Sequence, residues 1–199
     1  MEKQETKGRA VITSLFDAGT FVETGAYVRR PGETYDAVLC GYGAVEGKLC
    51  FAFVQDSDRK KGAFDELGAK KIASLYEQAV RTGAPVIGVF DSAGAVVVDG
   101  VSVLSAYGKL MSCVSGASGI IPQIALVTGV CGGMAAVTAG LFDLTVTVKD
   151  TAELFVNPPV LAGKDTGSAA IWTCMGYTVL LCFCLFKTSS LAKSVFNAH

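Results

Sequence analysis

Two short apolar runs, each followed by a loop of small residues and then by a helical pattern, constrain the fold of this chain most strongly. Residues 85–90 and 122–128 are β-prone, and they end in the small-residue loops 91–95 and 129–133. Continuous apolar runs of this length are typical of parallel strands that are buried on both faces. Their alternation with helices predicts an α/β layered fold, in which loops at strand ends commonly bind ligands. We expect both loops to lead directly into helix N-termini.

Periodicity and turn signals predict the remaining elements. An amphipathic helix is expected from Asp65 to Thr82, because apolar residues recur there at intervals of three and four, and Gly83 and Pro85 follow. Further expected elements are a short helix or extended arm within residues 9–22, a β-hairpin of residues 37–43 and 48–54, helices over 101–114 and 134–139, and strand-like runs over 144–148 and 152–156.

Composition argues against several classes of function. The 199 residues are 51% hydrophobic and 18% charged, which suits one packed domain and is too little charge for a disordered chain. The formal net charge is -1, so we expect no nucleic-acid partner. The seven cysteines lack paired CxxC spacing and the single histidine is His199, so we expect no metal site. This cysteine usage favours a reducing, cytoplasmic compartment.

The two small-residue loops suggest the chemistry of a site. The first amides of a helix lack partners and carry the positive end of the helix dipole, so an oxyanion is stabilised there without a charged side chain. Two such loops facing one cavity would form an oxyanion hole, which favours acyl or enolate chemistry. The structural alternative is that Gly94, Gly132 and Gly133 serve only tight packing between strand and helix.

Other kinds of site fit these loops poorly. Neither loop contains the GK[ST] of a phosphate-binding loop or the GxGxxG of a dinucleotide site. Ser92 could be proposed as a nucleophile, but it does not lie in a GxSxG motif and the only histidine is the last residue. We expect Asp91 and Ser92 to cap the following turn instead.

A series of motifs in a fixed order carries a family resemblance. They are residues 15–23, 41–47, 54–56, 62–72, 83–88 with 91–95, 118–124 with 129–133, and 148–156. Together they resemble the N-terminal half of biotin-dependent carboxyltransferases, the acyl-CoA carboxylase β-chain and acyl-CoA decarboxylase group of the crotonase superfamily. The resemblance implies a crotonase-like spiral of ββα units for residues 1–168. An atypical, apolar and Cys-rich segment, 169–199, follows.

The resemblance also implies a reaction, carboxyl transfer between carboxybiotin and the α-carbon of an acyl-CoA, in either direction. Backbone amides would polarise the thioester carbonyl and hold its enolate, so that no side-chain acid or base is required. The implied amide donors are Gly132 and Gly133 in one loop, with Gly94 and Ala95 in the other. Further implied substrate-binding residues are Gln55, Asp56, Ser57, Ser92, Ala93, Cys131 and Met134. Biotin would be attached to a separate carrier protein.

The chain departs from the family pattern in both loops. The family usually has two glycines and then an arginine after Asp-Ser, whereas this chain has Ala93, Gly94, Ala95 and Val96. In the other loop, Met134 replaces a small residue of the family. Bulkier loops would narrow substrate choice or abolish turnover.

Two functions therefore stay open. The first is an acyl-CoA-binding subunit that works with a separate C-terminal-half carboxyltransferase chain and a biotin carrier protein, in a homo- or hetero-oligomer. The second is a catalytically impaired assembly or regulatory subunit, or a truncated product of the same family. A stand-alone crotonase-type hydratase or isomerase is disfavoured, because no Asp or Glu stands out as its base. The uncharged segment 169–186 just reaches the length of a bilayer span, but we expect a buried or aberrant segment instead.

Overall fold

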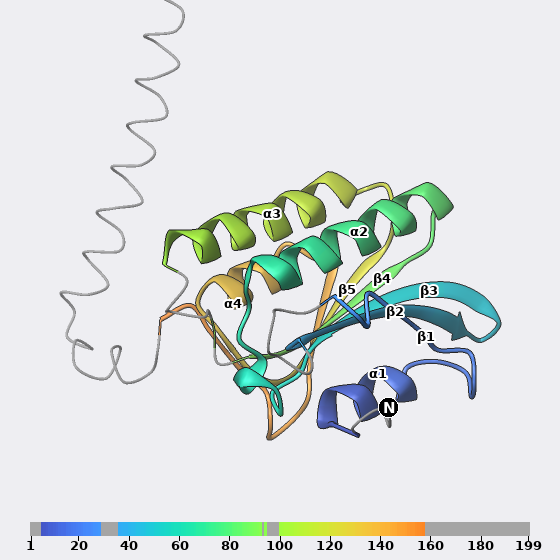
Figure 1. Cartoon of the computed structure of the whole chain (residues 1–199), viewed down its shortest axis with the longest axis horizontal. Helices are drawn as coiled ribbons and strands as arrows, with labels where there is room; N and C mark the ends of the chain where they lie inside the picture. The colour runs from blue at the N-terminus through green and yellow to red at the C-terminus, as the bar shows by residue number, and fades with distance from the viewer. Residues whose placement is uncertain (1–4, 29–35, 93, 95–99, 158–199) are drawn as a thin grey trace, which may run out of the picture. The chain divides into compact units, whose positions relative to one another are not determined.

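A single mixed β-sheet organises the computed structural model of this chain, which describes residues 5–28, 36–92, 94 and 100–157 (Figure 1). Its strands are β1 (Val22–Thr24), β2 (Val38–Val45), β3 (Lys48–Gln55), β4 (Val86–Ser92), β5 (Gln123–Gly132), β6 (Leu144–Thr147) and β7 (Glu153–Phe155). The helices are α1 (Lys7–Ser14), α2 (Glu66–Thr82), α3 (Val101–Ala117) and α4 (Met134–Ala139), with a short 3-10 turn, η1 (Lys60–Gly62).

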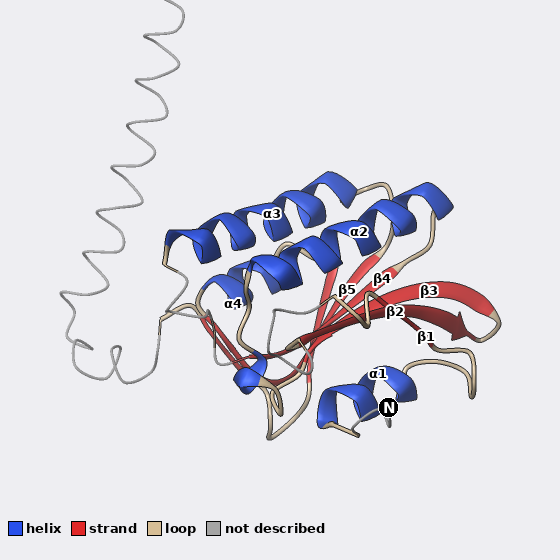
Figure 2. Cartoon of the chain, viewed as in Figure 1, coloured by secondary structure: helices blue, strands red, loops and turns tan. Residues whose placement is uncertain are grey.

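The strands follow the order β1-β2-β3-β4-β5-β6 across the sheet. β1, β2 and β3 pair antiparallel, whereas β3, β4, β5 and β6 pair parallel (Figure 2). β7 runs parallel to the last residues of β5. The carboxyl ends of β3, β4 and β5 therefore reach the same edge of the sheet, where α/β proteins place their ligands.

Side chains of the strands alternate between two apolar clusters on opposite faces of the sheet. Phe51 and Phe53 pack with buried residues of α2, α3 and α4. Ala52 lies in the cluster on the other face, which is covered by Ile12 of α1 and by Phe16, just after that helix (Figure 1). This period of two is the geometry of an extended strand, and it buries β3 on both faces.

Two locally encoded predictions are confirmed. The Asp65 side chain caps α2 by accepting a hydrogen bond from the Gly68 amide, and Gly83 ends the helix with a left-handed φ of 68°. The predicted hairpin forms from β2 and β3, and both residues of its tight turn, Glu46 and Gly47, have positive φ.

The structure corrects one prediction about the loops. The strand expected to end at Thr128 continues through Gly132, because Val130–Gly132 pair with β7. The prediction that the loop 91–95 leads directly into a helix depends on residues 95–99, which lie outside the described ranges. The pairing of β5 with β7 joins residues distant in sequence, so no local pattern reports it.

Several expectations concern residues outside the described ranges. They include the domain boundary at residue 168, the segment 169–199 with its suggested bilayer span, and the site residues Ala93 and Ala95. Among the helices of the described ranges, none combines the length and the apolar character needed to cross a membrane.

Candidate functional site

The two predicted loops meet at the carboxyl ends of β4 and β5. β4 shifts register between Phe90 and Ser92, so that Ser92 pairs with Cys131. This pairing brings Ser92 and Gly94 to the edge of the sheet at which β5 passes through Gly132 into α4. The structure thus brings together the described residues of both predicted loops.

Ser92 holds the first loop in place. Its side chain is fully buried, and its hydroxyl donates to the Gly62 carbonyl oxygen at 2.6 Å. The Ser92 hydroxyl oxygen also accepts a hydrogen bond from the Gly94 amide at 3.1 Å, which confirms the predicted capping of the turn for Ser92. The Gly94 amide is consequently engaged within the chain. Gly94 has a φ of 115°, which only glycine adopts without strain.

The second loop joins β5 to α4. Gly133 is the N-cap residue of α4, has a φ of 62°, and makes no side-chain capping bond. Its amide donates to the carbonyl oxygen of Phe155 at 2.9 Å. Because successive amides of a strand point to opposite sides, the Gly132 amide points away from β7. A Cβ at residue 132 would lie 2.7 Å from the Phe155 ring, so the close packing of β7 requires glycine there.

A polar pair that the sequence did not reveal lies beneath the two loops. The Ser57 hydroxyl, just after β3, donates to the Asp91 carboxylate at the end of β4. That carboxylate packs against Gly129 of β5, where any side chain would collide with it. Three neighbouring strands are thus linked at their carboxyl ends. The sequence does show polar residues after each apolar run. Which of them pair could not be predicted, because the pairing depends on the order of the strands in the sheet.

Gln55 and Asp56 point to opposite faces of the sheet, as neighbours at a strand end do. The Gln55 side chain is fully buried, and its amide oxygen and nitrogen have no hydrogen-bond partner in the structure. Asp56 is also fully buried, but its carboxylate accepts hydrogen bonds from the Thr6 hydroxyl and the Gly8 amide. It also pairs with Arg59 at 3.6 Å. Asp56 therefore anchors α1 to the end of β3.

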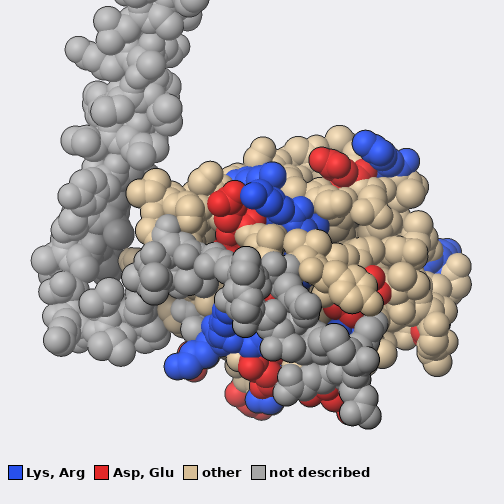
Figure 3. Space-filling model, in the orientation of Figure 1, with Lys and Arg blue, Asp and Glu red and all other residues tan. Residues whose placement is uncertain are grey.

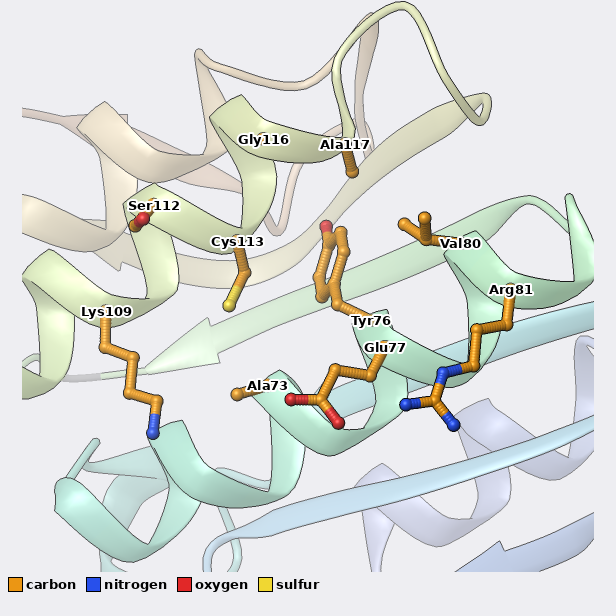
Figure 4. A pocket seen from close by; sticks show the side chains of 10 residues that line it. All are labelled: Ala73, Tyr76, Glu77, Val80, Arg81, Lys109, Ser112, Cys113, Gly116 and Ala117. Atoms are coloured by element: carbon orange, nitrogen blue, oxygen red, sulfur yellow. The ribbon is translucent and has the colours of Figure 1, made fainter.

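Two grooves lie away from these loops. One, of about 500 Å³, runs between α2 and α3, and Figure 4 shows Tyr76 and Cys113 between the helices, with Lys109, Glu77 and Arg81 around them. The other, of about 630 Å³, lies beside α1 and is lined by Glu5, Arg9, Ala10, Thr13, Ser14, Phe16 and Ala18. Neither groove contains a residue of the predicted site.

The Cys131 thiol at the second loop is not an activated nucleophile. Burial raises the pKa of the Cys131 thiol to about 11, so it stays protonated near neutral pH and is a poor nucleophile. The described residues contain no group of three His, Cys, Asp or Glu side chains that could hold a metal ion. Acidic and basic residues are interspersed on the face shown in Figure 3.

The fold is that of a crotonase-like carboxyltransferase, and comparison with known families gives the same class. Residues 3–173 match the carboxyl transferase domain family. The chain belongs to this family.

Two curated relatives illustrate the match. Methylmalonyl-CoA decarboxylase subunit alpha of Veillonella parvula is 34% identical over 183 residues, which cover 84% of this chain and 35% of that protein. The mitochondrial propionyl-CoA carboxylase beta chain of Homo sapiens is 38% identical over 165 residues, covering 76% and 30%. This chain thus spans about a third of the length of these relatives.

Solved structures confirm the predicted crotonase-like fold. Transcarboxylase 12S, crystallised with methylmalonyl-coenzyme A and methylmalonic acid bound, superimposes with a TM-score of 0.76 at 30% identity. The superposition covers 81% of this chain and 33% of that one. A Pseudomonas malonate decarboxylase hetero-tetramer gives a TM-score of 0.73 at 21% identity, covering 82% and 65%, and shares the fold.

Proposed function

We propose that this chain binds an acyl-CoA and stabilises its thioester enolate during carboxyl transfer to or from biotin. Family membership supports the reaction class. The observation that carries the proposal is the pairing of Ser92 with Cys131, which brings the small-residue loops after β4 and β5 to one edge of the sheet. A thioester carbonyl held at that edge would meet backbone N–H groups in place of charged side chains.

The proposed chemistry requires only hydrogen-bond donors from this chain. When the bond between the α-carbon and the carboxyl group breaks or forms, the electron pair at the α-carbon is delocalised onto the thioester oxygen. An N–H donor aimed at that oxygen stabilises the negative charge, and one such donor contributes about 3–4 kcal/mol in well-studied hydrolases. No proton needs to leave a side chain in this step.

The amides proposed for this role are Gly132 and Gly133 in the second loop and Gly94 in the first, and all three face other parts of the chain. The Gly132 amide points away from β7 and therefore toward β4, where Cys131 pairs with Ser92. The Gly133 amide donates to Phe155 and the Gly94 amide donates to Ser92, so each must leave its present partner to act as a donor. The role of Ala95, and of residues 55–57 along the CoA, stays a prediction.

The biotin side of the reaction is proposed to lie on other chains. The grooves beside α1 and between α2 and α3 contain none of the predicted site residues. We assign biotin to a separate C-terminal-half chain and a biotin carrier protein, as the resemblance to the N-terminal half of the family implies, and derive no step through biotin. The four free thiols of the described residues, Cys40, Cys50, Cys113 and Cys131, agree with the proposed reducing, cytoplasmic compartment.

A second candidate function is an assembly or regulatory subunit without turnover. It is favoured by the engagement of the Gly94 and Gly133 amides within the chain. The half-exposed side chain of Met134 at the start of α4 also favours it. Such a subunit would associate stably with a carboxyltransferase partner and leave the partner's kinetics unchanged.

Calorimetric titration with acetyl-CoA, propionyl-CoA and free CoA tests the proposal. We expect binding that depends on the acyl group and that Gly133→Val abolishes. Gly119→Val is the matched control, because Gly119 also has a positive φ, 74°, and open space around it, but precedes β5 at the other end of that strand. Loss of binding in Gly133→Val alone supports the thioester site. Equal loss in both variants, or no binding by the folded chain, contradicts it.

Activity then separates the two candidate functions. With a C-terminal-half chain and a biotinylated carrier added, the enzyme hypothesis predicts decarboxylation of malonyl-CoA or methylmalonyl-CoA that Gly133→Val removes. The assembly hypothesis predicts co-purification with the partner and partner kinetics that do not respond to Gly133→Val.

A further inference from the structure

The turn η1, which follows β3, has a strained backbone. Lys60, Lys61 and Gly62 lie one after another in the left-handed region, with φ values of 48°, 54° and 67°. Glycine adopts this region without strain, whereas a residue with a Cβ is strained there. Such strain persists only where the surrounding structure holds it, and it gathers at functional sites. The contacts of the turn therefore indicate what the strain serves.

The turn is pressed against the end of β4. A Cβ on Gly62 would collide with the Asp91 carbonyl oxygen and would lie 2.9 Å from the Cα of Ser92. Both of these atoms belong to the backbone, which cannot move aside as the end of a flexible side chain can. Glycine is therefore required at residue 62, and the left-handed conformation of Lys60 and Lys61 leads the chain into this contact.

The turn and the residues after it hold the loop after β4 at two points. The Ser92 hydroxyl donates to the Gly62 carbonyl oxygen at 2.6 Å. The Phe64 amide donates to the Gly94 carbonyl oxygen at 3.0 Å. The Phe64 side chain is fully buried, and its ring packs on Tyr107 of α3 with the ring centroids 4.8 Å apart. The loop is thus tied to the apolar core through this segment.

These contacts lie where β4 is irregular. β3 pairs with β4 as far as Val54 and Val89, and β4 then shifts register between Phe90 and Ser92. Beyond that shift, Ser92 is held by its pairing with Cys131 of β5 and by its hydrogen bond to the turn. The place of the loop relative to β5 therefore depends on the turn.

We propose that the turn η1 is a positioning element of the acyl-CoA site, with Gly62 as the positioning residue. In this role the turn contacts no substrate. It holds the loop after β4 beside Gly132 of β5, so that one thioester group can meet both loops. Because a displacement of about 1 Å can lower a rate on the order of a hundredfold, a strained turn that fixes the loop is favoured over a relaxed one. The inference rests on the proposed function and adds to it the residues that fix this loop.

Residue 61 allows the turn to be tested without a collision at β4. Gly62→Ala would force the turn away from β4 and disturb the fold itself. Lys61 is exposed, so its side chain can be replaced without loss of packing. Asparagine adopts the left-handed region readily, whereas a β-branched residue such as valine does not. Lys61→Asn and Lys61→Val thus remove the same charge and differ in how well they keep the turn.

Calorimetric titration with propionyl-CoA and free CoA gives the first readout. Lys61→Val should weaken the binding of propionyl-CoA on the order of tenfold and change that of free CoA by less than about twofold, because only the thioester meets the loops. Lys61→Asn should match the wild type with both ligands. A loss of affinity for both ligands in both variants would instead show an effect of the lysine charge and contradict the positioning role.

Hydrogen exchange of the Phe64 amide gives a second readout, which needs no ligand. This amide donates to the Gly94 carbonyl oxygen, so its exchange reports whether the turn still holds the loop. We expect Lys61→Val to raise the exchange rate of this amide on the order of tenfold through local opening, and Lys61→Asn to leave it unchanged.

Glu46→Val is the matched control for strain elsewhere in the chain. Glu46 is exposed and has a φ of 50° in the turn between β2 and β3, at the other end of β3. This variant strains a left-handed residue away from the loops and should lower the overall stability as Lys61→Val does. Its binding of propionyl-CoA and the exchange of its Phe64 amide should stay close to those of the wild type.

The outcomes separate this inference from the proposed function. Equal binding of propionyl-CoA by Lys61→Val and Lys61→Asn, or equal losses in Lys61→Val and Glu46→Val, would overturn the positioning role. A Phe64 amide that stays protected in Lys61→Val would contradict that role alone. A wild-type chain without preference for propionyl-CoA over free CoA would contradict the proposed function, and the positioning role would fall with it.

Discussion

The carboxylate of Asp91 lies against the Cα of Gly129, at a distance that leaves no room for a side chain on residue 129. Asp91 is the residue before the last of β4 and Gly129 belongs to β5, so this contact sets how closely the two central strands approach at the edge where both loops begin. The Ser57 hydroxyl holds the same carboxylate from the end of β3.

Gly129→Ala should therefore destabilise the chain. The added methyl group must displace the Asp91 carboxylate or the strand, and overpacking of this kind costs about 1–3 kcal/mol of the free energy of unfolding. Urea unfolding measures the loss. Gly116→Ala is the control, because Gly116 lies in α3 with open space around it, and alanine there should stabilise by about 0.5–1 kcal/mol. Equal stability of the two variants would show that the contact with Asp91 is unimportant.

Thr6→Val should loosen α1. Thr6 caps this helix by accepting from the Arg9 amide, and its hydroxyl also donates to the buried Asp56 carboxylate. Loss of the cap and of a buried acceptor's partner should lower the free energy of unfolding by about 1–3 kcal/mol. Thr13→Val makes the same change at an exposed position of α1 and should shift stability by less than about 0.5 kcal/mol. Similar chemical denaturation midpoints for both variants would argue against the role of Thr6.

Tyr76→Phe should lower the thermal stability of the chain, because it leaves a buried hydrogen-bond acceptor without its donor. The Tyr76 hydroxyl donates to Oε1 of Gln123 at 2.9 Å, and the Gln123 side chain in turn donates to the Val114 carbonyl oxygen at 3.0 Å. We expect a loss of about 1–3 kcal/mol, seen as a lower thermal midpoint. Tyr42→Phe removes the hydroxyl of a half-buried tyrosine that packs on Phe51, and it should leave the midpoint nearly unchanged. A midpoint for Tyr76→Phe that matches the control would contradict the expectation.

Alkaline pH should destabilise the chain through Cys40. Burial raises the pKa of this thiol from 9.0 to about 12. Between these values the unfolded chain has lost the proton that the folded chain still holds, so the free energy of unfolding falls as pH rises through this window. The slope from one such group approaches about 1.4 kcal/mol per pH unit. Urea unfolding in reductant at pH 8.5, 9.5 and 10.5 should show a shallower decline for Cys40→Ala than for the wild type. Equal declines in the two proteins would exclude the Cys40 thiol as a source of this pH dependence.

Local patterns predicted the elements whose ends are encoded locally. Asp65 and Gly83 bound α2 in the sequence as they do in the structure, and the turn residues of the β2–β3 hairpin were equally readable. The length of β5 could not be predicted from local patterns, because its last residues pair with β7, more than twenty residues away in the sequence. The bond from Thr6 to Asp56 spans fifty residues and was likewise invisible.

The candidate site could likewise be predicted only in part. Small residues at the ends of two apolar runs indicated that Ser92, Gly94, Gly132 and Gly133 could share one edge, and the register of β4 and β5 brings them there. The direction of each amide depends on partners supplied by other segments. Phe155 takes the Gly133 amide only because β7 returns to pair with β5. Chemistry that uses backbone groups is therefore harder to predict from sequence than chemistry that uses side chains.

The division of the apolar interior by the sheet has a consequence for how the chain opens. The cluster under α1 is small and depends on Ile12 and Phe16, whereas the cluster under α2 and α3 is much larger. Release of α1 would expose the small cluster and leave the large one intact. Amide hydrogens of α1 should therefore exchange with solvent through a partial opening of low free energy, while those of α2 should exchange only when the whole domain unfolds.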